Sequence, residues 1–195
     1  MELENYSQIL SSKSPVPGGG SAASYVGALS SSLLMMVCNL TIGKKRYEEY
    51  DEELENIIST LEEKRLGLLE CMKEDEEMFS LLSVSYKTKE NIEECLLKAL
   101  EPPYRTIRLL SDVVSHLDRL SVIGSRLALS DVSCSAALAL GSLLASKANV
   151  KVNTRLLEDK EKANSINREV DELVDKCSDI CMRIYNRIDE ELSNG

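Results

Sequence analysis

Two long stretches with almost no charge constrain the fold of this sequence more than any other feature. The first runs from Ser21 to about Gly43 without one Asp, Glu, Lys or Arg, and the second runs from Leu127 to Ser146 with only Asp131. Both mix Leu with Ala, Ser and Gly, whose small side chains let helices approach closely. The first stretch is long enough to span a membrane. Its many serines favour the alternative, a buried central helix of a soluble bundle.

The rest of the chain predicts amphipathic helices around these two. Apolar residues recur at spacings of three, four and seven, the period of one helix face. The expected helices are one or two turns near residues 6–10, then 47 to the mid-80s, 91–100, 104–123 and 166–192, and the third of these should stop before Pro102 and Pro103. Aromatic residues make up only 4% of the chain, and it has nine Gly and four Pro, which disfavours strands and sharp turns. We therefore predict an all-α, single-domain helical bundle over residues 1–195.

Charge and cysteine content exclude several classes of function. The net charge of −10 argues against a nucleic-acid binder, which needs a basic face. His116 is the single histidine and no C-x-x-C occurs, so no metal site is expected. The acidic, polar start MELENYSQIL predicts no signal peptide, and the six cysteines are expected to be reduced thiols in a cytoplasmic protein.

Asp75 is the residue that is least well explained by packing in an apolar core. It occupies the inward position of the stripe that contains Leu68, Met72, Phe79 and Leu82. A buried carboxylate is costly, and its pKa is raised by desolvation, which suits it to proton transfer. The alternative is a slight rotation of the helix that brings Asp75 to the surface.

The segment PVPGGGS opens the first uncharged helix. The consecutive Gly18, Gly19 and Gly20 allow close approach of a ligand to the backbone, and the N–H groups of a helix start attract anions. It is not a Walker loop, and the alternative is a flexible turn in which Gly20 or Ser21 caps the helix.

Three more polar residues lie on the second uncharged helix and its extension. Asp131 follows Ser130 near the start of the helix, and Asn149 and Asn153 share one face because they are four residues apart. The alternative for Asp131 is that Ser130 caps the helix and Asp131 is a residue of its first turn without a functional role. The alternative for the two asparagines is that they are exposed polar residues near a helix end.

The block from Ser14 to Tyr47 resembles the cyclodeaminase domain of the formiminotransferase-cyclodeaminase family, which includes methenyltetrahydrofolate cyclohydrolases. It is similar to the pattern P-x-P-G-G-G-S followed by G-A and L-T-x-G-K-K-x-Y. KEDEEMF, GSRLALSD and ANVKVNT then match further family segments in order, at Asp75, Asp131, and Asn149 with Asn153. The chain departs from the family pattern at Ser125, at Thr154 and in a shorter segment after Asp75.

The resemblance implies a dimeric all-α enzyme that acts on folate one-carbon units, with Asp75 as the catalytic acid. It implies a substrate site lined by the residues Gly18, Gly19, Gly20, Ser21, Lys44, Lys45, Tyr47, Asp131, Asn149 and Asn153. The tetrahydrofolate derivative is the substrate, and no further cofactor or metal is implied. A homodimer is also favoured by the flat surfaces of the two small-residue helices.

Three functions remain open from the sequence. A formiminotetrahydrofolate cyclodeaminase would join N10 to the formimino carbon on N5 and release ammonia, forming a methenyl bridge. A methenyltetrahydrofolate cyclohydrolase would open that bridge with water in the same site. A helical binding or scaffold protein that lost the chemistry is the third alternative.

Overall fold

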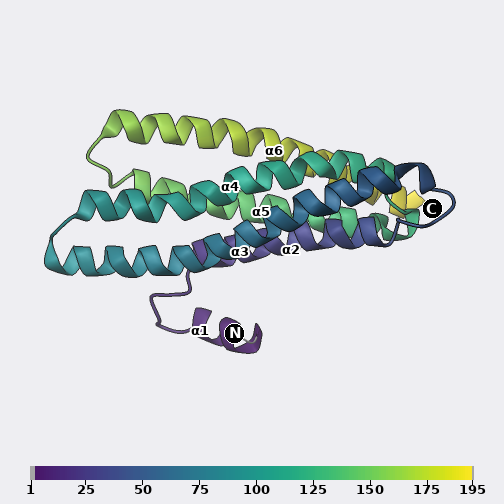
Figure 1. Cartoon of the computed structure of the whole chain (residues 1–195). Helices are drawn as coiled ribbons and strands as arrows, with labels where there is room; N and C mark the ends of the chain where they lie inside the picture. Colours follow the sequence, from purple (N-terminus) through teal and green to yellow (C-terminus); the bar gives the residue numbers. More distant parts are fainter. Residues whose placement is uncertain (1–2, 195) are drawn as a thin grey trace.

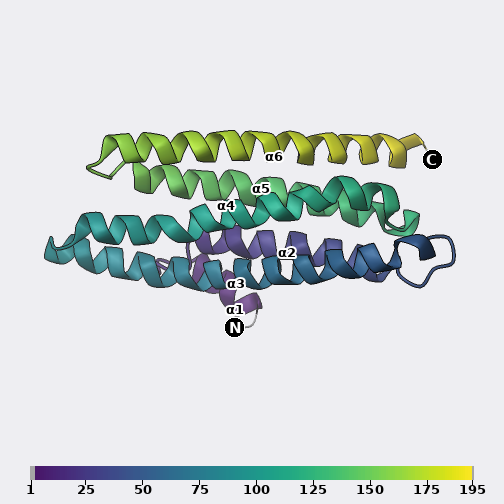
Figure 2. The ribbon, with the colours of Figure 1, turned by 45° about the horizontal axis from the view of Figure 1, so that its top comes forward.

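A computed structural model describes residues 3–194 of the chain as a bundle of helices (Figure 1). The helices are α1 (Leu3–Leu10), α2 (Gly19–Asn39), α3 (Asp51–Thr88), α4 (Ile92–Ile123), α5 (Leu129–Thr154) and α6 (Lys160–Asn194). Short 3-10 turns, Glu48–Tyr50 and Arg126–Ala128, precede α3 and α5. Helices α2 to α6 run along one common axis, while α1 projects from the side of the bundle (Figures 1 and 2). The all-α, single-domain prediction is confirmed.

The two uncharged helices, α2 and α5, lie side by side inside the bundle. Buried serines join them: the hydroxyls of Ser30 and Ser135 are 2.9 Å apart, and the Ser142 hydroxyl donates to the carbonyl of Ala23 at 2.6 Å. Gly27 leaves room for this approach, because an added Cβ would lie 2.9 Å from the Ser142 hydroxyl. Small residues and hydroxyls therefore serve as the contact surface between the central helices.

Amphipathic helices cover this pair. Helix α6 buries a stripe at helical spacing, made of the residues Val170, Val174, Cys177, Cys181, Ile184 and Ile188. Helix α4 packs against both central helices and buries Ile107, Leu110, Val114 and Leu117. Most positions of the predicted stripes on α4 and α6 are thus core residues.

Helix α4 corrects one expectation, because it continues through Pro102 and Pro103 instead of stopping before them. Proline has no N–H, so Pro103 leaves the carbonyl of Ala99 without its helical donor. The side-chain amide of Asn153, on α5, donates to that carbonyl at 3.2 Å. A donor from a distant part of the chain thus satisfies the carbonyl group that proline leaves free.

Helix α2 is also displaced from its expected bounds. It begins at Gly19 and ends at Asn39, before the uncharged stretch ends near Gly43, so Lys44, Lys45 and Arg46 lie in the turn beyond the helix. By length and composition, Gly19–Asn39 and Arg126–Thr154 could each span a membrane, and about half of each is buried within the bundle. Core helices of soluble bundles have the same properties, so this is weak evidence for a membrane protein.

Candidate active site

Asp75 lies where the middle of α3 passes the start of α2. The backbone N–H of Ser21, in the first turn of α2, donates to Asp75 Oδ2 at 2.8 Å. A pocket of about 250 Å³ opens beside this contact. Its lining consists of Pro15, Val16, Gly18, Gly19, Gly20, Asp75, Phe79, Ala99, Asn149, Val152 and Asn153. The glycine segment, the carboxylate and the two asparagines predicted from the sequence therefore share one pocket.

Gly20 is needed for this arrangement because Asp75 occupies the space of a side chain. A Cβ on Gly20 would lie 2.6 Å from the carboxyl carbon of Asp75. A Cβ on Gly19 would make ordinary contact with the Asn149 side chain at 3.5 Å, and one on Gly18 would meet nothing within 4 Å. Only one of the three glycines is thus required by the contact with the carboxylate.

The surroundings of Asp75 favour its neutral form. Burial raises the pKa of the Asp75 carboxyl, and the neighbouring Glu76 charge raises it further, whereas the Ser21 N–H opposes the shift. Glu76 also accepts a hydrogen bond from the Ser21 hydroxyl at 2.8 Å, and that hydroxyl lies 3.1 Å from the hydroxyl of Tyr6. A partly buried carboxyl with a raised pKa is better suited than an exposed one to accept a proton and return it.

Asn149 and Asn153 line the pocket, and the amide nitrogens of both donate to backbone carbonyls. Asn149 Nδ2 donates to the carbonyl of Ala145 at 2.8 Å, and Asn153 Nδ2 donates to the carbonyls of Ala99 and Asn149. A side-chain amide oxygen can accept a hydrogen bond from a ligand that carries N–H groups.

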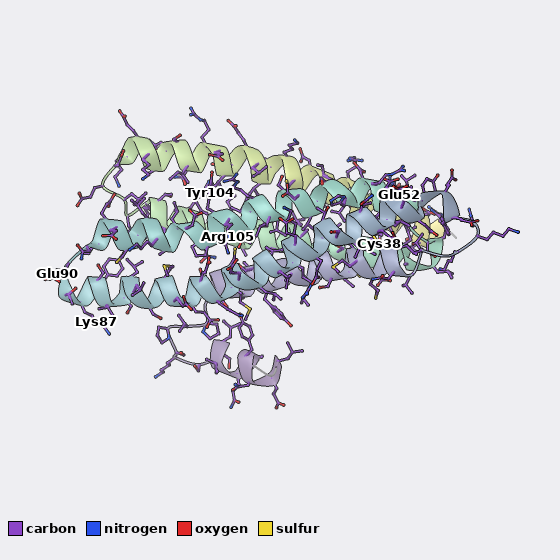
Figure 3. All side chains as sticks on the ribbon, viewed as in Figure 1. Cys38, Glu52, Lys87, Glu90, Tyr104 and Arg105 are labelled. Carbon is purple, nitrogen blue, oxygen red and sulfur yellow. The ribbon has the colours of Figure 1, made fainter. Side chains whose placement is uncertain are left out.

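The structure does not bring the other predicted site residues to this pocket within one chain. Lys44 Nζ donates to the hydroxyl of Ser125 at 2.9 Å, and Tyr47 accepts the backbone N–H of Arg126 at 3.2 Å. Asp131 lies in the first turn of α5, near these residues. Helix α2 has 21 residues, so this group is about 30 Å from the glycine segment. Figure 3 labels Cys38 and Glu52 at this end of the bundle, opposite Lys87 and Glu90.

Sequence reasoning missed several residues at the pocket. Phe79, treated as core, is exposed and lines the pocket. Ala99 and Val152 contribute apolar wall, and Glu76 with Tyr6 supports the first turn of α2. The sequence did indicate that Lys44 and Tyr47 lie far from the glycine segment. The uncharged stretch between them predicts one uninterrupted helix, and a helix of about 20 residues places its two ends about 30 Å apart.

These features define an all-helical protein with a partly buried carboxyl in a glycine-backed pocket. The family model described as formiminotransferase-cyclodeaminase matches residues 2–172. The chain therefore belongs to the formiminotransferase-cyclodeaminase family and is an enzyme of that family.

Individual relatives agree with this membership. The methenyltetrahydrofolate cyclohydrolase of Methylorubrum extorquens is 29% identical over 98% of this chain and 97% of its own length. The crystal structure of formiminotetrahydrofolate cyclodeaminase from Thermotoga maritima superposes with a TM-score of 0.88 at 29% identity, covering 96% of this chain and 97% of that one. The formimidoyltransferase-cyclodeaminase of Dictyostelium discoideum is 21% identical, and this chain spans 36% of its length.

Proposed function

We propose that this enzyme acts on the one-carbon unit held between N5 and N10 of tetrahydrofolate, with Asp75 as the proton-transfer group. The observation that carries the proposal is the Asp75 carboxyl, which is partly buried, has a raised pKa and faces a pocket that begins at a helix N-terminus. The Asn149 and Asn153 oxygens suit the N–H groups on the edge of a pterin ring. Family membership supports the folate substrate.

The first candidate reaction is that of a formiminotetrahydrofolate cyclodeaminase. The N10 nitrogen attacks the carbon of the protonated formimino group on N5, whose nitrogen already carries two hydrogens, and Asp75 as a carboxylate accepts the N10 proton. Asp75 then returns this proton to the departing nitrogen, so that ammonia leaves and the methenyl bridge remains. One group thus serves as base and then as acid, and a pKa near the working pH favours both steps. The Thermotoga relative of similar length supports this candidate.

The second candidate is the cyclohydrolase reaction in the same pocket. Asp75 accepts a proton from water as the water adds to the methenyl carbon, and it then protonates N5 as the carbon–N5 bond breaks. The remaining hydroxyl proton is released to solvent as the formyl carbonyl forms. The product is 10-formyltetrahydrofolate. The Methylorubrum relative, named for this reaction and covered over nearly its full length, supports this candidate.

One assay tests the proposal and separates the candidates. Purified protein is mixed with formiminotetrahydrofolate or with methenyltetrahydrofolate, and the absorbance of the methenyl species is followed. Cyclodeaminase activity makes this absorbance rise with the first substrate, and cyclohydrolase activity makes it fall with the second. Absence of both changes at high enzyme concentration, with no folate binding by calorimetry, would contradict the proposal.

Neither reaction changes the oxidation level of the carbon, so we propose that no redox cofactor is required beyond the tetrahydrofolate substrate. We also propose that no metal takes part, because the described residues include no group of three or more His, Cys, Asp or Glu side chains that could hold one. Six free thiols support a cytoplasmic location.

We also propose a homodimer, supported by the apolar side chains that α2 leaves uncovered, among them Leu29 and Met36, each 39% exposed. Sedimentation at twice the chain mass of 21.7 kDa is the expected result.

A further inference from the structure

Ser21 contacts two neighbouring acids on α3 at once. Its backbone N–H donates to Asp75 Oδ2 at 2.8 Å, and its hydroxyl donates to Glu76 Oε1 at 2.8 Å. Further along α2, the hydroxyls of Ser24 and Ser32 donate to carbonyls of their own helix, as is usual for serine inside a helix. The hydroxyl of Ser21 is instead directed to another helix, and through it one residue joins Asp75 and Glu76.

Tyr6 on α1 fixes the direction of the Ser21 hydroxyl. The two hydroxyl oxygens lie 3.1 Å apart, and both residues are buried. Burial raises the pKa of Tyr6, the bond to Ser21 opposes this, and the charges of Glu76 and Asp75 raise it further, so Tyr6 keeps its proton. Because Ser21 has one hydroxyl proton and gives it to Glu76, the proton between the two hydroxyls comes from Tyr6. The chain of donors therefore runs from Tyr6 through Ser21 and ends on Glu76.

Glu76 lacks a cation that would compensate its charge. Among residues 3–194, no Lys or Arg forms an ion pair with Glu76. Glu74, on the same turn of α3, has such a partner in Arg105, at 3.1 Å. A carboxylate held beside another carboxyl without a cation costs stability, because like charges repel. This arrangement is typical of sites that adjust the proton affinity of a reacting group rather than of packing.

The surroundings of Asp75 leave Glu76 as the charge that acts on it. Helix α2 carries no charged residue, and on α4 the cation Arg105 donates to the Cys71 thiol at 3.0 Å. Burial is the main cause of the raised pKa of Asp75, the Ser21 N–H opposes it, and the Glu76 charge adds to it. The titratable and polar residues that the packed helices bring around this point are Tyr6 from α1, Ser21 from α2, Cys71, Glu74 and Glu76 from α3, Arg105 from α4 and Asn149 from α5.

We propose that Ser21 is a positioning residue of the active site and that its hydroxyl holds the Glu76 carboxylate beside Asp75 as a fixed negative neighbour. This inference rests on the proposed function for the reaction in which Asp75 takes part. In either candidate reaction, a carboxyl with such a neighbour more readily keeps the proton that it accepts until it delivers the proton to the departing nitrogen. Without the hydroxyl, the partly exposed Glu76 side chain can turn into water, where its charge acts weakly on Asp75.

The titration of Asp75 tests the proposal without any assay of activity. Protein is labelled with carbon-13 at the aspartate side-chain carboxyl, and the resonance that is absent from Asp75→Asn is followed by NMR as the pH is varied. Glu76→Gln keeps an acceptor for the Ser21 hydroxyl but removes the charge, so the midpoint should fall by about 0.5–1 pH unit. Ser21→Ala should lower the midpoint in the same direction. An unchanged midpoint in either variant would overturn the proposal.

Two further variants separate the proposed path from other effects. Glu77→Gln makes the same charge change at the next, exposed position and should move the midpoint much less than Glu76→Gln. In a Glu76→Gln background the Ser21 hydroxyl has no charge to hold, so adding Ser21→Ala should cause no further fall. An equal effect of Ser21→Ala in both backgrounds would show that the hydroxyl acts on Asp75 by another route, and would overturn the proposal.

The pH profile of kcat/KM connects this titration to turnover. Asp75 accepts a proton first, so activity should rise with pH through its pKa, and Glu76→Gln and Ser21→Ala should move this rise to lower pH. A rise that stays in place while the midpoint of Asp75 moves would overturn the positioning role of Ser21. A wild-type protein inactive toward both folates would instead contradict the proposed function, and the midpoints would still show whether Ser21 holds Glu76 beside Asp75.

Discussion

The backbone N–H of Ser21 donates to the carboxylate of Asp75 at 2.8 Å and so connects the start of α2 to the middle of α3. Asparagine at position 75 keeps an acceptor for this bond but cannot take up and return a proton. We expect Asp75→Asn to fold normally and to lose at least about 100-fold in kcat, the usual contribution of a general acid–base group. Glu55→Gln, an exposed carboxylate on the same helix, is the control. Turnover equal to wild type in Asp75→Asn would remove Asp75 from its role.

The raised pKa of Asp75 predicts a pH dependence of stability. Because burial raises the pKa in the folded state above that of the unfolded chain, the folded protein binds this proton more tightly. The stabilising contribution of Asp75 is present below the unfolded pKa of about 3.9 and is lost as the pH rises through the folded value.

Asp75→Asn removes the cost of burying a charge, so its free energy of unfolding should exceed that of wild type at pH 7 to 8. The difference should shrink as the pH is lowered toward 4. Urea unfolding across this pH range measures the effect. A variant that is less stable than wild type at pH 8, by a margin that disappears in acid, would show that the Ser21 contact outweighs burial.

Gly20 is predicted to be far more sensitive to substitution than Gly18. In Gly20→Ala the new methyl group would overlap the Asp75 carboxyl and displace it, while alanine itself suits the helix. Displacement of a reacting group by about 1 Å can cost about 100-fold in rate. Gly18→Ala meets nothing within 4 Å, so its loss of kcat should be much smaller at similar stability. Equal losses in the two variants would argue against this contact.

Much of the fold could be predicted because its signals are local. The absence of charge in residues 21–43 marks a buried helix, and the spacing of Val170, Val174, Cys177 and Cys181 marks a helix with one buried face. The path of α4 through Pro103 could not be predicted this way. The amide that makes it tolerable belongs to Asn153, which is distant in sequence and close only after folding.

Part of the pocket lining was predictable, namely Asp75, the glycines and the two asparagines, but the contacts between these residues were not. The sequence indicates Asp75 because a carboxylate interrupts an apolar stripe, and it indicates the glycine segment because three consecutive glycines open a helix. Nothing local indicates that Gly20 faces Asp75, since that contact joins different helices. Lys44 was expected in the same pocket, yet α2 carries it to the opposite end of the chain's bundle.

The serine pair between the central helices should contribute measurably to stability. The Ser30 and Ser135 hydroxyls are fully buried, bond to each other, and each reaches the backbone carbonyl of the other residue. Ser30→Ala should lower the free energy of unfolding by about 1–3 kcal/mol, because it leaves a buried partner unsatisfied. Adding Ser135→Ala should cost less than the sum of the two single changes. Additive losses would show that the hydroxyls act independently, and Ser80→Ala, at an exposed position, provides the reference.

Asn153 and Pro103 should behave as a coupled pair although they lie on different helices. Replacing Asn153 by leucine leaves the Ala99 carbonyl without a donor, because the residue that would supply the helical N–H is proline. The expected loss in the free energy of unfolding is about 1–3 kcal/mol. Pro103→Ala restores a backbone N–H four residues after Ala99, so the same Asn153→Leu change should cost clearly less in that background. Thermal or urea unfolding of the four proteins measures the coupling. An equal cost of Asn153→Leu in both backgrounds would show that Asn153 stabilises the protein by another contact.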